Sequence, residues 1–107
     1  PYPVLGLAER AAGAWEGLTH AEIDTRHPGA RQGSWRPEGY EHDEELRARA
    51  RAALRPFEEA RVLAVTHEGL IRALDGDPDP LPNLAARWVV VEGDAIRPEG
   101  ERISLRT

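Results

Sequence analysis

Residues 61 to 74 read RVLAVTHEGLIRAL, and the fold predicted for the whole chain depends on this stretch. Its residues 62 to 65 are an unbroken apolar run without the polar alternation of a half-exposed strand. Such a run is typical of a strand buried on both faces of a parallel sheet. Leu70, Ile71 and Leu74 then recur at the spacing of one helical face. The stretch therefore predicts a buried strand and a following helix, with His67 at their junction.

His67 would thus lie where open α/β sheets bind ligands, at the carboxyl end of a strand. The first backbone amides of the following helix have no partner inside that helix and bind anions well. A His at this place can donate a hydrogen bond, carry a charge or act as a nucleophile. Gly69 would let a ligand approach the backbone, because it has no side chain. The alternative is a strand-end His with an internal partner, followed by an ordinary glycine at a helix start.

Helix signals occur at two other places. Thr19 and Glu22 have the spacing of a capping box, which predicts a short helix over residues 20 to 26. An apolar stripe at helical spacing predicts the longest helix within residues 41 to 59, and Pro56 should kink or shorten its end.

Strand signals complete the pattern. Short apolar runs predict strands at residues 4–7, 88–91, 95–97 and 102–105. Gly93 and Asp94 predict a turn between two of them. Alternation of strands with amphipathic helices predicts a layered α/β fold with a mostly parallel sheet.

Length and composition narrow the class of protein. The 107 residues fit one small domain or part of one, and not two, and a net charge of -5 argues against a nucleic-acid partner. The absence of Cys excludes disulfides, thiolate metal sites and Cys nucleophiles. No apolar run approaches the roughly 20 residues of a membrane span, and no signal-peptide pattern opens the chain. A cytoplasmic protein without a membrane partner is predicted.

The second group of chemically capable residues is Glu9 with Arg10, directly after the strand predicted at residues 4–7. A carboxylic acid near a transferring phosphoryl group could protonate the leaving oxygen, and an Arg could hold a substrate anion. The alternative is a pair of solvated loop residues. His20 and His27 could share a helical face, but no third ligand type lies at a useful spacing, so neither a metal nor a cofactor is predicted.

Four stretches, taken in order, resemble the histidine phosphatase superfamily, which includes the cofactor-dependent phosphoglycerate mutases. They read LAERAAGAWEGLTHAEIDTRHP, PEGYEHDEELRARARAAL, RVLAVTHEGLIRAL and LPNLAARWVVVEGD. Together they cover nearly the whole chain, and the first and third are the more specific. The resemblance implies a three-layer α/β sandwich around a mostly parallel sheet, of the phosphoglycerate mutase type.

The resemblance also implies roles for particular residues. In that family, a His in an Arg-His-Gly motif near the amino terminus is phosphorylated, and a second His after a later strand helps to hold the phosphoryl group. His67 matches the second His, and Glu9 matches the acid that protonates the leaving group. The amides around Glu68 and Gly69 would support the phosphate. Arg10 matches a substrate-contacting position of the mutase-like members.

The chain departs from the family pattern in three places, one of which is the lack of a counterpart to the family's second phosphate-clamping Arg. It contains no Arg-His-Gly triplet, so the phosphorylated His has no counterpart. The Gly-Glu-Ser segment before the family's long helix is replaced by Tyr40, Glu41 and His42. Residues 1 to 107 therefore resemble the carboxyl-terminal portion of a single phosphatase domain, incomplete at its amino terminus. We expect the natural protein to have an amino-terminal segment that these residues lack.

The expected function is hydrolysis of a small phosphomonoester through a phosphohistidine whose His lies outside these residues. Half of a phosphate cradle should have little activity, so residues 1 to 107 alone are expected to be inactive. Two alternatives stay open, a catalytically inactive binding module and a mutase-type phosphotransferase. The mutases carry a Gly-Asn-Ser type sequence after the second His, whereas Glu68, Gly69 and Leu70 are closer to the phosphatase branch. The expected partner is a small phosphorylated substrate, and a homo-oligomer is left open.

Overall fold

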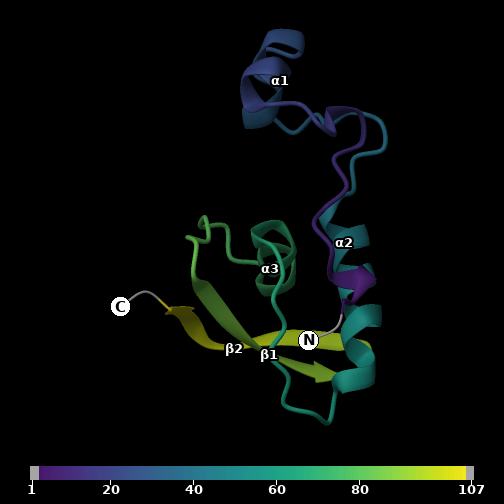
Figure 1. Cartoon of the computed structure of the whole chain (residues 1–107), viewed down its shortest axis with the longest axis vertical. Coiled ribbons are helices and arrows are strands. Elements are labelled where there is room, and N and C mark those ends of the chain that lie inside the picture. Colours follow the sequence, from purple (N-terminus) through teal and green to yellow (C-terminus); the bar gives the residue numbers. More distant parts are fainter. Residues whose placement is uncertain (1–2, 106–107) are drawn as a thin grey trace. The chain divides into compact units, whose positions relative to one another are not determined.

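A computed structural model describes residues 3–105, which combine helices and strands (Figure 1). The helices and strands are α1 (His20–Arg26), α2 (Asp43–Leu54), α3 (Glu68–Asp75), β1 (Ala85–Glu92) and β2 (Ala95–Ser104). These residues divide into two compact units, of which one is Arg10–His42 and the other joins residues 3–9 to residues 43–105. Among residues 3–105, no helix has both the length and the apolarity that crossing a bilayer requires.

The core of the larger unit lies between α2 and α3. Four buried apolar side chains meet there: Leu46, Ala50, Leu70 and Ala73. Their spacing along the sequence puts them on one face of each helix. Arg47 of α2 also donates a hydrogen bond to the carbonyl of Ala73, with 3.3 Å between Nη1 and O. These contacts hold α3 against α2, and so they fix the place of His67, which directly precedes α3.

The helices begin and end where local signals place them. The capping box of α1 is formed, because Thr19 Oγ1 accepts from the amide of Glu22 and the Glu22 carboxylate accepts from the amide of Thr19. The predicted helix over residues 20 to 26 is therefore confirmed. The long helix is α2, and Pro56 lies in a 3₁₀ turn, Arg55–Phe57, that follows it. The predicted shortening at Pro56 is also confirmed, since Pro cannot donate the next helical hydrogen bond.

Strands β1 and β2 form an antiparallel hairpin closed by Gly93 and Asp94. Gly93 has a φ of 61°, which a tight two-residue turn requires. Two contacts join the turn to the residues after α2. Arg55 Nη1 lies 2.9 Å from Asp94 Oδ1, and the Gly93 amide donates a hydrogen bond to Glu58 Oε2 at 2.8 Å. The predicted turn is confirmed. The two short strands predicted after it are one continuous strand, β2.

The predicted parallel sheet is not formed within residues 3–105. The sheet found there is the antiparallel β1–β2 hairpin, residues 62–65 have no regular secondary structure, and Leu5–Leu7 is a 3₁₀ turn. Leu63 and Val65 are each 88% exposed. A strand needs a neighbour for its backbone groups, and no described strand pairs with residues 62–65. The strands predicted at residues 4–7 and 62–65 are wrong for this structure, and His67 follows an exposed segment.

The smaller unit, Arg10–His42, is built around the indole of Trp15, which is only 7% exposed. Three rings surround it, with centroids 6.0 to 6.4 Å away: His27, Trp35 and Tyr40. The Arg36 guanidinium lies 5.6 Å from the centre of the Trp15 ring, a cation–π distance. The interior of this unit is therefore largely aromatic, and it also includes the buried aliphatic side chain of Ile23, which is 6% exposed.

Candidate active site

His67 is the residue at which α3 begins. Its backbone is extended, with φ -119° and ψ 156°, and its carbonyl accepts the first helical hydrogen bond, from the Ile71 amide at 3.1 Å. Its side chain makes no capping bond and is 55% exposed. The first amides of a helix have no partners inside it and carry its positive dipole end. The predicted helix start is confirmed, and it places an imidazole beside an anion-attracting helix end.

Glu9 is positioned by α2. Arg49 of α2 donates from Nη1 to the carbonyls of Gly6 and Ala8, at 2.8 and 3.0 Å. Gly6 allows this close approach, because an added Cβ would lie 2.5 Å from the Cβ of Ala53. The backbone that leads to Glu9 is therefore fixed to the longest helix.

A further bond joins this segment to the residue before His67. Thr66 Oγ1 donates to the carbonyl of Leu7 at 2.6 Å. As a result, Glu9 Oε2 lies 4.0 Å from His67 Nδ1. This distance is longer than a hydrogen bond but within reach of an ion pair between a carboxylate and a protonated imidazole. The structure thus brings together two predicted site residues that are far apart in the sequence.

Glu68 and Gly69 form the first turn of α3. The Glu68 carboxylate accepts a hydrogen bond from the Leu81 amide at 3.2 Å and lies 3.6 Å from the guanidinium of Arg72. A carboxylate would repel a phosphate, so only the backbone amide of Glu68 suits the predicted phosphate contact. Gly69 is partly buried and adds no side chain to this helix end.

Arg10 belongs to the smaller unit, although it follows Glu9 in the chain. Its Nη1 donates to the carbonyl of Glu41 at 2.8 Å, and its guanidinium lies 5.5 Å from the centre of the Tyr40 ring. The predicted substrate contact of Arg10 stays a prediction.

Sequence reasoning missed the positioning roles of Arg49 and Thr66. Arg49 lies between Arg47 and Arg51 in a repetitive Arg-Ala stretch, and nothing local distinguishes it from them. Thr66 did carry a signal, because it is a polar residue at the end of the apolar run and directly before His67. Its hydroxyl is the donor that holds the Glu9 segment in place.

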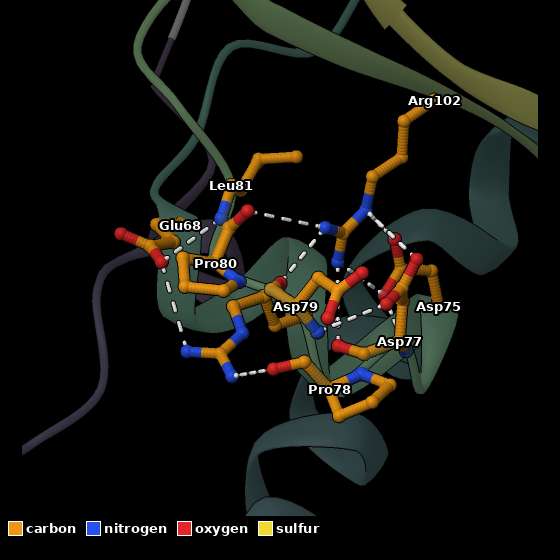
Figure 2. A network of polar contacts seen from close by, with 9 residues as sticks. Glu68, Asp75, Asp77, Pro78, Asp79, Pro80, Leu81 and Arg102 are labelled. Carbon is orange, nitrogen blue, oxygen red and sulfur yellow. Dashed lines mark hydrogen bonds and ion pairs between the residues drawn. The ribbon is translucent and has the colours of Figure 1, made fainter.

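The loop after α3 is organised around Arg102 of β2 (Figure 2). Arg102 Nε lies 2.9 Å from Asp75 Oδ2, and the carboxylate of Asp75 is fully buried. Burial alone would raise the pKa of Asp75, but the hydrogen bonds from Arg102 and from the Asp77 amide outweigh it, so this pKa lies below its ordinary value. The hydrogen bond with Asp75 raises the pKa of Arg102. The pair is therefore charged throughout the neutral range.

The Asp75–Arg102 pair predicts a loss of stability in acid. Folding lowers the pKa of Asp75 below 3.8, the ordinary value for an Asp carboxyl. The ionised carboxylate therefore contributes fully to the free energy of unfolding above that pH, and this contribution is lost as the pH falls through the lowered pKa. Urea unfolding should show Asp75→Asn less stable than the unaltered chain at pH 7, with the difference shrinking only below pH 3.8. A difference that is constant down to pH 2 would contradict the assigned ion pair.

Comparison with known proteins identifies the family. Residues 3–88 match the model of the histidine phosphatase superfamily (branch 1). The glucosyl-3-phosphoglycerate phosphatases of two Mycobacterium tuberculosis strains, CDC 1551 / Oshkosh and ATCC 25618 / H37Rv, are each 34% identical over 104 residues, which cover 81% of this chain and 46% of the relative. The chain thus spans about half the length of these curated relatives, and no solved structure matches it. Since the family model covers most of its residues, the chain belongs to the histidine phosphatase superfamily.

Proposed function

We propose that this chain contributes part of the active site of a phosphatase that hydrolyses a small phosphomonoester through a phosphohistidine. The nucleophilic His comes from a segment outside residues 1–107, which contain no Arg-His-Gly triplet. His67 and the first amides of α3, at Glu68 and Gly69, hold the transferring phosphoryl group, and Glu9 is the general acid. Arg10 contacts the substrate.

The observation that carries this proposal is the 4.0 Å distance between Glu9 Oε2 and His67 Nδ1 at the start of α3. In phosphoryl transfer, the leaving oxygen and the oxygens that need stabilisation are bonded to the same phosphorus atom. Their protein partners must therefore lie within a few ångströms of one another. A carboxylic acid and an imidazole next to an anion-attracting helix end meet this requirement.

The reaction has two steps. In the first, a His nitrogen attacks phosphorus, the bond from phosphorus to the ester oxygen breaks, and Glu9 gives its proton to that oxygen, so that an alcohol leaves. In the second, the Glu9 carboxylate takes a proton from water, whose oxygen attacks phosphorus, and the bond from phosphorus to the His nitrogen breaks, so that inorganic phosphate leaves and the His is regenerated. His67 donates to a phosphoryl oxygen in both steps and lowers the energy of the charge that develops there.

The substrate class follows from the site and from the relatives. Both side chains are about half exposed, 55% for His67 and 47% for Glu9, so a hydrophilic phosphate ester can reach them. The relatives carry the name glucosyl-3-phosphoglycerate phosphatase, and that compound is the first substrate to try. A phosphorylated small metabolite is the proposed substrate class.

The proposal is tested with the natural protein that contains these residues, assayed beside residues 1–107 alone. We expect turnover of a chromogenic phosphomonoester by the natural protein and none by residues 1–107. Rapid quenching during turnover should trap an acid-labile phosphohistidine outside this chain. Turnover by residues 1–107 alone would refute the external nucleophile. Phosphate-ester binding without turnover by the natural protein would replace the proposal with an inactive binding module.

The role of Glu9 predicts a dependence on the leaving group. Glu9→Gln should slow hydrolysis of an alkyl phosphate by about 100- to 10,000-fold, the usual contribution of general acid catalysis. It should slow hydrolysis of a nitrophenyl phosphate much less, because nitrophenolate leaves without a proton. Glu59→Gln, at an exposed position before residues 62–65, is the matched control and should leave both rates unchanged. Equal losses on both substrates would remove Glu9 from the role of general acid.

A further inference from the structure

The loop between α3 and β1 is held by several contacts to one side chain, that of Arg102. Arg102 donates from Nη1 to the Asp79 carbonyl at 2.8 Å and from Nη2 to the Asp77 carbonyl at 3.3 Å, in addition to its pair with Asp75. The Arg102 side chain is only 15% exposed. Figure 2 shows the loop folded around this guanidinium. One partly buried Arg thus fixes the path of the chain after α3.

The far end of this loop returns to the start of α3. There the Leu81 amide donates to Glu68 Oε1 at 3.2 Å, and the Leu81 side chain is buried. Arg72 connects the same two places, because its Nη1 lies 3.6 Å from Glu68 Oε1 and its Nη2 donates to the Pro78 carbonyl at 2.7 Å. A continuous set of contacts therefore leads from Arg102 to the Glu68 carboxylate, which belongs to the residue next to His67.

We propose that Arg102 is a positioning residue that keeps the Glu68 carboxylate turned away from the bound phosphate. This inference rests on the proposed function, which places the phosphate at His67 and the first amides of α3. Without the contacts from the loop, the Glu68 carboxylate would keep only its pair with Arg72 of the same helix and could turn toward that helix end. It would then repel the phosphate and cancel part of the attraction of the helix dipole. The loop held by Arg102 thus restrains the orientation of the Glu68 carboxylate.

The test is a double-mutant cycle on the natural protein, with binding of inorganic phosphate as the measured quantity. Arg102→Gln should weaken phosphate binding about tenfold, the order expected for one added negative charge near a bound anion. In a Glu68→Gln background, the same substitution should have little further effect, because no charge remains to be restrained. Arg97→Gln is the matched control on β2, since Arg97 makes an exposed ion pair with Glu92, and it should bind phosphate normally.

A merely structural Arg102 would give a different result, with equal losses of phosphate binding in both backgrounds, and this would overturn the inference. If Arg102→Gln does not fold, Arg72→Gln removes the direct restraint on Glu68 and leaves the Asp75–Arg102 pair intact. It should show the same dependence on Glu68, and equal losses in both backgrounds would again refute the inference. Failure of the unaltered natural protein to bind phosphate would instead refute the proposed function, and this inference with it.

Discussion

Under the proposed function, His67→Ala is expected to lower kcat of the natural protein about 100- to 1,000-fold, the usual effect of removing one fixed donor to a developing negative charge. The imidazole stands at the start of α3, so its loss removes a donor that needs no rearrangement during the reaction. Steady-state hydrolysis of a chromogenic phosphomonoester measures the effect. His67→Gln should lose less, because an amide can still donate one hydrogen bond.

The control for this substitution is His20→Ala. His20 is exposed at the first position of α1 and belongs to the smaller unit, so its replacement should leave kcat unchanged. Circular dichroism and thermal unfolding of both variants would show whether α3 is intact. A His67→Ala protein that is folded and has an unaltered kcat would exclude His67 from the active site.

Leu46→Ala is expected to destabilise the larger unit by about 2–5 kcal/mol, as do most deletions of a fully buried Leu side chain. Leu46 is 0% exposed and belongs, with Leu70, to the buried cluster between α2 and α3. A loss of this size is a large part of the usual stability of a small domain. Urea unfolding, followed by circular dichroism, measures it as a fall in the free energy of unfolding.

The matched control is Leu63→Ala, because Leu63 is 88% exposed in residues 62–65. Within residues 1–107, it should change stability by less than about 0.5 kcal/mol. Made in the natural protein, the same substitution tests the predicted parallel sheet. A loss comparable to that of Leu46→Ala would mean that residues 62–65 pair with strands from outside this chain. A neutral result there would refute that sheet.

Features that depend on neighbouring residues could be predicted from the sequence. The capping box of Thr19 and Glu22 and the turn at Gly93 and Asp94 each need only a few residues, and both are formed. The start of α3 after His67 also depends on only a few neighbouring residues, and it too is formed as predicted. Helix ends and two-residue turns are decided within one turn of chain, so local patterns suffice.

Features that depend on distant partners could not be predicted. An apolar run such as residues 62–65 has the composition of a buried strand, but a strand forms only beside another strand. The sequence contains 14 Arg residues, and no local pattern distinguishes Arg49 or Arg102 as the ones that hold backbone carbonyls. The approach of Glu9 to His67 is likewise not readable from spacing, and only the family resemblance implies that both residues belong to one site.

The two ends of the smaller unit are hydrogen-bonded to each other. The Glu41 amide donates to the Ala11 carbonyl at 2.8 Å, and the Ala11 amide donates to the Glu41 carboxylate at 3.1 Å, so the chain leaves and returns at one place. Lengthening a loop whose two ends are held together costs little, because each doubling of the loop length adds only about 0.6 kcal/mol of loop-closure entropy. Insertions and substitutions between residues 28 and 39 should therefore be tolerated without displacing Glu9. The backbone before Glu9 is held independently, by the hydrogen bonds that Arg49 donates to it.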